Sequence, residues 1–244
     1  MDSIKQNYEP SGDLHKSNAL DTSQAMQLHS KWHKTNLRGK QRDAVHTNAT
    51  LVHTNAKRLQ QAYRQQIEPY SNYIQFAVTL TLKTVATISV NRFDNYGDDQ
   101  FKFTAVLNDE TLESRIPYFT ALLRHKLYGN KAKHKNKQEW ATPLVIAVIE
   151  GRNTQKRTHF HFAIGNVPQS KLANFQEIVE QVWERCDFSH RETCVKPITD
   201  SNGWLNYITK EVGYTDSDAL DVVHSTIPPF IQNSICTESR LLAG

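Results

Sequence analysis

The pattern of hydrophobic and polar residues changes near Pro69 and divides the chain into two regions. Before Pro69, apolar residues recur at helical spacing. After it, short segments alternate in polarity or are rich in β-branched and aromatic residues, which is typical of strands. We expect an N-terminal helical region, partly disordered, at residues 1–70, a domain at 71–214 and a C-terminal tail at 215–244.

A small internal repeat marks the N-terminal region, because the sequence Val-His-Thr-Asn-Ala occurs at 45–49 and again at 52–56. This seven-residue offset predicts one long helix over about residues 42–66. The helix would pack on its own domain or on a partner helix. A second helix is predicted at about 21–37, after capping residues at 21–23. The apolar stripe of the long helix consists of Val45, Ala49, Val52, Ala56, Leu59 and Tyr63.

The segments after Pro69 predict a mixed fold. Strands are expected at 73–82, 101–107, 143–150, 158–164 and 193–198, and helices at 111–128, 168–185 and 203–212. The short loop at 151–157 predicts that the strands on either side of it form a hairpin. The order of elements and this hairpin favour an α+β fold, in which a central antiparallel sheet is flanked by helices and preceded by the N-terminal helical region.

Composition excludes several classes of protein. No apolar run approaches the roughly 18 residues of a membrane span, and the first ten residues contain no apolar stretch typical of a secretory signal. The three cysteines include no C-x-x-C pair, which argues against a disulfide framework or a Cys₄ zinc module. We therefore expect a cytoplasmic protein in a reducing compartment, without a membrane partner.

Positive charge gathers in the middle of the chain, although the net charge is only +4. Residues 124–137 contain six Lys or Arg and no Asp or Glu, and the loop at 151–157 contains three more basic residues. Such clusters are either solvated loops or contacts to nucleic-acid phosphates. The candidate DNA-binding residues are Arg124, Lys126, Lys131, Lys133, Lys135, Lys137, Arg152, Lys156 and Arg157.

A candidate metal site lies on the predicted hairpin. His159 and His161 alternate along one strand, so their side chains share a face, and a turn centred near 154–155 places Glu150 opposite His159. Two imidazoles and a carboxylate suit a divalent ion, and Mn²⁺ or Mg²⁺ would serve a nuclease. The alternative is a pair of ordinary strand histidines, because short motifs match by chance.

Tyr207 and Lys210 are candidate catalytic residues on the last predicted helix. They are three residues apart and therefore share a helix face. A phenol, with a pKa near 10, is a poor nucleophile unless its phenolate is stabilised, for example by an ammonium group. The alternative is a tyrosine packed at a helix interface beside an exposed lysine.

Together these motifs resemble the HUH endonuclease superfamily, and within it the rolling-circle replication initiators. The segments 76–81 (FAVTLT), 158–162 (THFHF) and 207–210 (YITK) are similar to its three motifs, and the resemblance covers about residues 71–214. It implies that His159, His161 and Glu150 hold the metal, and that Tyr207, assisted by Lys210, cuts single-stranded DNA through a 5′-phosphotyrosine. Tyr214 follows the predicted end of the helix, so a single catalytic tyrosine is favoured.

The resemblance also implies partners. The substrate would be single-stranded DNA from an origin hairpin. The sequence has no Walker A pattern, so we expect no fused helicase of the kind found in many viral members. A helicase and a polymerase of the host would be further partners.

Other interpretations remain open at this point. An HUH transposase would use the same residues and chemistry, and an RRM-like module would bind nucleic acid without metal or catalysis. A scaffold built on the long helix explains only residues 42–66. Metal dependence separates the enzymes from the binding module.

Overall fold

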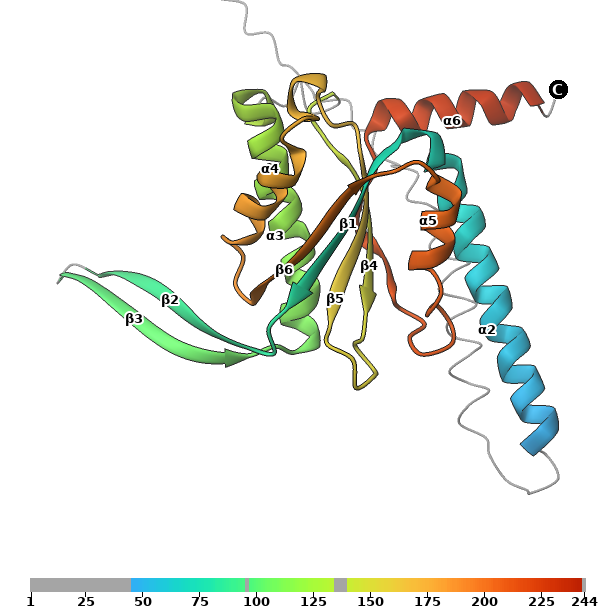
Figure 1. The fold of residues 1–244 in the computed structure, drawn as a ribbon, viewed down its shortest axis with the longest axis horizontal. Helices are drawn as coiled ribbons and strands as arrows, with labels where there is room; N and C mark the ends of the chain where they lie inside the picture. Colours follow the sequence, from blue (N-terminus) through green and yellow to red (C-terminus); the bar gives the residue numbers. More distant parts are fainter. Residues whose placement is uncertain (1–44, 95–96, 134–139, 243–244) are drawn as a thin grey trace, which may run out of the picture. The chain divides into compact units, whose positions relative to one another are not determined.

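The computed structural model describes residues 45–94, 97–133 and 140–242 (Figure 1). The helix expected at 21–37 lies outside these residues, as do Lys135 and Lys137. The described elements are, in order, α2 (Val45–Ile67), η2 (Glu68–Tyr73), β1 (Ile74–Leu82), β2 (Val85–Asp94), β3 (Gly97–Val106), α3 (Asp109–Tyr128), η3 (Gly129–Lys133), β4 (Leu144–Glu150), β5 (His159–Gly165), η5 (Gln169–Lys171), α4 (Phe175–Trp183), β6 (Ser189–Pro197), α5 (Ser201–Ile208), β7 (Leu220–Thr226) and α6 (Pro229–Leu242).

The centre of the fold is a five-stranded sheet in the order β6-β1-β5-β4-β7, and every pair of neighbours is antiparallel. Helices flank this sheet, and the helical α2 precedes it (Figure 1). The α+β fold predicted from the sequence is therefore confirmed. The predicted hairpin is also present, since β4 pairs with β5 and Glu150 stands opposite His159.

Successive side chains of the central strands point to opposite faces of the sheet, which divides the core into two halves. Phe160 and Phe162 on β5 belong to a cluster that also contains side chains of α3 and α4. Leu144 and Ile146 on β4, together with Ala163 on β5, belong to a second cluster, with side chains of α2 and α5. His159 and His161 are separated from Ala163 along β5 by an even number of residues, so their side chains point to the same face of the sheet as that of Ala163. They therefore lie on the α2/α5 side.

The described part of α2 is packed against the domain that follows it. Ala56, Leu59 and Tyr63 of the predicted stripe are buried, whereas Val52, one turn earlier, is 44% exposed. The long helix and its packing on its own domain are thus confirmed for these positions. A boundary at residue 70 would divide a continuous core, because Leu59 and Tyr63 share a cluster with β4 and α5.

The segment expected to be a tail contributes to the sheet. β7 pairs with β4, and the amide of Ala147 donates a hydrogen bond to Ser225 Oγ (3.0 Å). α6 follows, and its Ile231 is buried in the α2/α5 cluster. The acidic bias of residues after 215 suggested a tail, whereas the β-branched run in 220–226 forms an edge strand.

Three other elements differ from the expectation. β2 was not predicted, and it pairs with β3 in a separate two-stranded ribbon between β1 and α3 (Figure 1). The helix expected at 168–185 is shorter, because η5 precedes α4. The helix expected at 203–212 is α5, which ends at Ile208. No helix in the described part of the chain is both long and apolar enough to cross a membrane.

Candidate functional site

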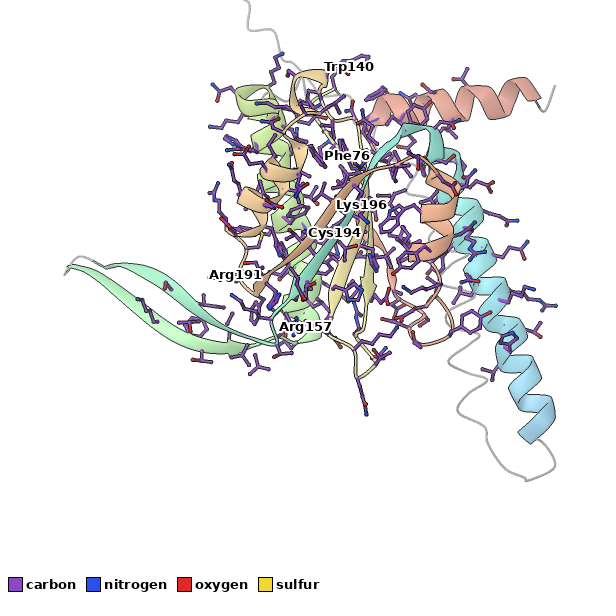
Figure 2. All side chains as sticks on the ribbon, in the orientation of Figure 1. Phe76, Trp140, Arg157, Arg191, Cys194 and Lys196 are labelled. Atoms are coloured by element: carbon purple, nitrogen blue, oxygen red, sulfur yellow. The ribbon has the colours of Figure 1, made fainter. Side chains whose placement is uncertain are left out.

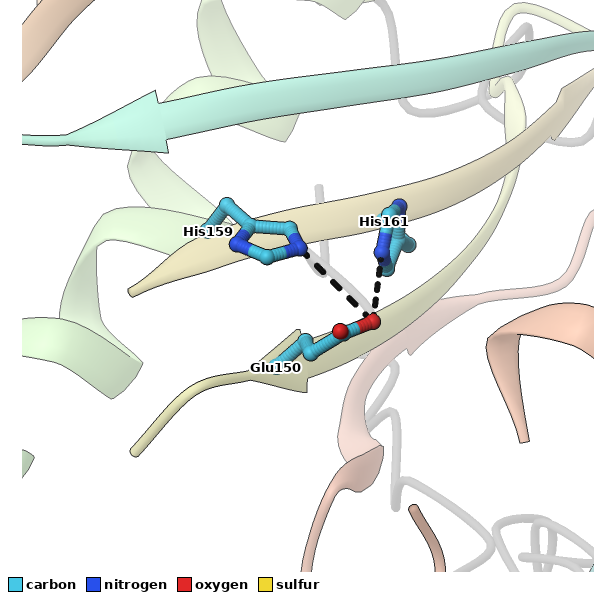
Figure 3. A group of neighbouring side chains, drawn as sticks. All are labelled: Glu150, His159 and His161. Atoms are coloured by element: carbon cyan, nitrogen blue, oxygen red, sulfur yellow. Dashed lines mark hydrogen bonds and ion pairs between the residues drawn. The ribbon is translucent and has the colours of Figure 1, made fainter. Parts of the chain in front are cut away.

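The β4–β5 hairpin brings a carboxylate and two imidazoles together. Glu150 pairs with His159 across the hairpin, and His161 follows on the same face of β5. Glu150 Oε2 lies 2.9 Å from His161 Nε2 and 3.6 Å from His159 Nε2 (Figure 3). One possible ligand atom from each residue lies within 4.8 Å of the other two. The three predicted ligands therefore form one cluster that could bind a metal ion.

The other ring nitrogen of each histidine is held by the protein. His161 Nδ1 is 2.9 Å from the hydroxyl of Thr79 on β1, and His159 Nδ1 is 2.9 Å from the carbonyl oxygen of Arg157. Hydrogen bonds of this kind fix the orientation of metal-ligating imidazoles. Both Nε2 atoms are consequently directed at the same carboxylate oxygen.

The protonation states of Glu150 and His161 favour the binding of a cation. Burial would raise the pKa of Glu150, but hydrogen bonds from Lys210 and His161 outweigh it and lower this pKa to about 2. Burial, followed by the charge of neighbouring His159, lowers the pKa of His161 to about 4. Near neutral pH the cluster thus offers an ionised carboxylate and a neutral imidazole, which are the forms that bind metals.

Two lysines neutralise the carboxylate in this structure. Lys210 Nζ lies 2.6 Å from Glu150 Oε2, and Lys156 Nζ lies 3.4 Å from Oε1. Lys156 also reaches Glu211 Oε1 at 3.0 Å. Interaction with Glu211 and then Glu150 raises the pKa of Lys156. A bound metal ion would compete with these ammonium groups for the same oxygen atoms.

Tyr207 lies beside the cluster on α5. Its ring centroid is 5.4 Å from that of His161, and the ring stacks on Trp204 at 5.4 Å with an interplanar angle of 19°. The Trp204 indole donates to the carbonyl of Phe162 at 3.3 Å, which ties α5 to β5. Tyr207 is 46% exposed, so its side chain can be reached from solvent.

Lys210 connects Tyr207 to the carboxylate. Its Nζ lies 3.7 Å from the centroid of the Tyr207 ring while it contacts Glu150. Burial lowers the pKa of Lys210, but its interactions with Glu150 and Tyr207 outweigh this and raise it. Although α5 ends at Ile208, the Lys210 amide still donates to the Tyr207 carbonyl (3.1 Å). This turn keeps the two residues close, as their spacing predicted.

Tyr214 lies elsewhere, with its ring 5.4 Å from that of His53 on α2. Among the described residues, its ring contact is with α2 and not with the histidine pair. The structure thus offers Tyr207 as the tyrosine next to the candidate metal ligands.

Two of the predicted DNA-binding arginines make contacts within the fold. The side chain of Arg152 is only 12% exposed and lies 3.1 Å from Glu113 and 3.6 Å from Asp216. Arg124 Nε donates to the carbonyl of Ala141 at 2.7 Å. Both guanidinium groups thus hold parts of the fold together.

The other predicted basic residues that the structure describes fall at two ends of the sheet. The exposed Lys126, Lys131 and Lys133 lie at the end of α3, where the Tyr128 hydroxyl bonds to the carbonyl of Asn166, just after β5 ends. The site lies at the start of β5, about 20 Å away along the strand. Figure 2 shows Trp140, which precedes β4, at the opposite end of the sheet from Arg157.

Lys156 and Arg157 are the predicted basic residues that lie near the cluster. Both are exposed, and Arg157 pairs with Glu192 at 2.7 Å.

Sequence reasoning missed two contacts of the site. Thr79 lies in the segment read as a structural strand, and its alternation with Leu80 was the signal that it faces the histidines. Glu211 follows directly after Lys210, but nothing in the local pattern indicated that it would meet Lys156.

No family model, curated protein or solved structure matches this chain.

Proposed function

We propose that this chain is a metal-dependent endonuclease and strand transferase of the HUH type, acting on single-stranded DNA. The observation that carries the proposal is the position of Tyr207 beside the Glu150/His159/His161 cluster, with Lys210 in contact with both. The three sequence motifs of the resemblance lie on β1, β5 and the end of α5, and all three contribute residues to this one region.

The donor set fits a divalent ion such as Mn²⁺ or Mg²⁺. Two imidazole nitrogens and an ionised carboxylate leave positions for phosphate oxygens. His159, His161 and Glu150 would hold the ion, which would polarise a non-bridging oxygen of the scissile phosphate.

Tyr207 would provide the nucleophile. Its phenolic oxygen attacks the phosphorus, the bond from phosphorus to the 3′ oxygen breaks, and a 5′-phosphotyrosine forms. The phenolic proton leaves through solvent, and the departing 3′ oxygen gains one to become a hydroxyl. Lys210 stabilises the developing phenolate, since its ammonium group lies over the ring. Because one phosphodiester replaces another, a later 3′-hydroxyl reverses the step without ATP.

The physiological role we propose is initiation of rolling-circle replication at an origin hairpin, with helicase and polymerase supplied by the host. The exposed Lys156 and Arg157 lie next to the cluster and would contact the DNA backbone.

The test is a covalent adduct. The chain is incubated with single-stranded origin oligonucleotides and Mn²⁺, and the products are separated on a denaturing gel. Tyr207→Phe should form no adduct. Tyr214, six residues after the end of α5, is a matched exposed tyrosine, and Tyr214→Phe should react as the wild type does.

The result also separates the other interpretations. Adduct formation by Tyr207→Phe at the native rate would contradict the assignment and point to Tyr214. Binding that is equally tight in a chelator, with no adduct for any variant, would favour the RRM-like binding module. Oligonucleotides derived from element ends, compared with origin hairpins, distinguish transposition from replication.

A further inference from the structure

Helix α2 lies outside the region that resembles the HUH family. It nevertheless contacts the end of α5, the helix that carries Tyr207. Gln60 Nε2 donates to the carbonyl of Thr209 at 2.8 Å. Arg64 Nε donates to Thr209 Oγ1 at 3.1 Å, and its Nη2 donates to the carbonyl of Asn206 at 3.3 Å. Both side chains thus converge on the segment that carries Tyr207 and Lys210.

These contacts add partners from α2 to the C-terminal end of α5. The last carbonyl groups of a helix have no partner within it, and cations near that end are favourable. α5 has only eight residues, and Asp200 caps its start by accepting from the Gly203 amide at 2.8 Å. Thr209 is fully buried, and its carbonyl accepts two hydrogen bonds, one from the Val212 amide at 3.2 Å and one from Gln60.

The backbone of α2 also touches the turn that follows Lys210. Gly213 has φ +78°, and a Cβ atom at this position would lie 2.8 Å from the carbonyl oxygen of Ala56. The turn after α5 therefore packs directly on the α2 backbone. α2 holds the chain on both sides of Lys210, at Thr209 and at Gly213.

We propose that Gln60 and Arg64 are positioning residues for Tyr207 and Lys210. Neither touches the metal cluster in the described contacts, and both act through Thr209 and Asn206. They fix the end of α5 and so keep the phenol and the ammonium group beside Glu150 and His161. This inference rests on the proposed function only in assigning the nucleophile to Tyr207, because the hydrogen bonds belong to the fold.

The test uses the full chain with Arg64→Ala, Gln60→Ala and the matched control Arg58→Ala. Arg58 is exposed on the same helix, and no hydrogen bond or ion pair is found for it among the described residues. Below the unfolding temperature, both test variants should form the adduct about tenfold more slowly, since a misplacement of about 1 Å costs up to about 100-fold. Their affinity for Mn²⁺ should stay within about twofold of the wild type.

Arg64→Lys retains a cation at the helix end and should recover part of the rate. Native adduct rates in both Arg64→Ala and Gln60→Ala would overturn the proposal. A parallel loss of Mn²⁺ affinity would also overturn it, because the whole site would then be damaged.

Amide hydrogen exchange separates this inference from the proposed function. In Arg64→Ala, faster exchange confined to residues 205–213 supports the positioning role, even if the wild type forms no adduct and the proposed function fails. Exchange that is unchanged, or raised uniformly across the chain, overturns it. In Arg58→Ala the exchange should match the wild type.

Discussion

Glu150→Gln removes the negative charge on which the candidate metal site depends. In this structure the carboxylate contacts His161, Lys210 and Lys156 while its side chain is only 6% exposed. The pKa of Glu150, lowered from 4.5 to about 2, corresponds to about 3 kcal/mol in favour of the charged form, at about 1.4 kcal/mol per pKa unit.

The expected loss of stability in chelator is somewhat smaller than this value. The amide oxygen of glutamine still accepts a hydrogen bond from Lys210, so we expect the free energy of unfolding to fall by about 2 kcal/mol. For a chain of this size, each kcal/mol shifts the unfolding temperature by about 2–4 °C, which gives about 4–8 °C. Circular dichroism during heating, in EDTA, measures this shift.

The same variant should lose its response to metal. Mn²⁺ at 100 times its dissociation constant would stabilise the wild type by about 2.7 kcal/mol, and Glu150→Gln should show little of this gain. Glu192→Gln is the matched control, because this carboxylate is 68% exposed and pairs with Arg157 on the surface. Exposed ion pairs contribute about 0–1 kcal/mol, so the control should unfold near the wild-type temperature.

One result would refute the reasoning. If Glu150→Gln unfolds at the wild-type temperature in EDTA and gains as much from Mn²⁺ as the wild type does, the carboxylate neither stabilises the site nor binds the metal.

Three further predictions follow from the same geometry. Thr79→Val removes the hydroxyl 2.9 Å from His161 Nδ1 and should weaken Mn²⁺ binding by about tenfold in calorimetry, while Thr79→Ser should not. Burial and the charge of the neighbouring His159 lower the pKa of His161 from 6.5 to about 4. In the presence of chelator, the imidazole of His161 therefore takes up a proton at a higher pH in the unfolded chain than in the folded chain. The free energy of unfolding should fall as pH drops from about 6.5 to about 4. His161→Asn should flatten that slope in urea titrations, and an unchanged slope would contradict the assignment. Gly213→Ala should destabilise by about 1–3 kcal/mol in urea, and by more than Gly129→Ala, because both glycines have positive φ but only Gly213 meets a neighbouring backbone.

The candidate metal cluster was predictable because its geometry is local. A short segment of eight residues, 151–158, joins β4 to β5, so the sequence constrains which residues face each other. Glu150 opposite His159, and His161 on the same face, follow from that hairpin and from strand alternation. By contrast, Thr79 and His161 are 82 residues apart, and the pairing of β1 with β5 was needed to bring them together.

Charge was the least reliable guide to the surface. The sequence shows how many Lys and Arg residues there are, but not which acidic residues they contact in the fold. Arg152 was assigned to DNA, yet it lies against Glu113 and Asp216, which are distant in the chain. Lys131 and Lys133 are exposed as expected, but the direction of α3 places them at the end of the sheet away from the histidines.

The two faces of the sheet explain why the site depends on segments beyond the family resemblance. The α3/α4 face carries the large aromatic core, with Phe160 and Phe162 fully buried. The side chains of His159 and His161 alternate with those of Phe160 and Phe162 along β5, and Glu150 is paired with His159. All three therefore share the opposite face of the sheet with the α2/α5 cluster. That cluster takes buried side chains from α2, α5, β7 and α6, which includes segments on both sides of residues 71–214. Because α5 packs on β5 through Trp204 and on α2 through Thr209, the placement of Tyr207 is set by both contacts. The segments outside the resemblance therefore belong to the structure that holds the candidate nucleophile next to the candidate metal ligands.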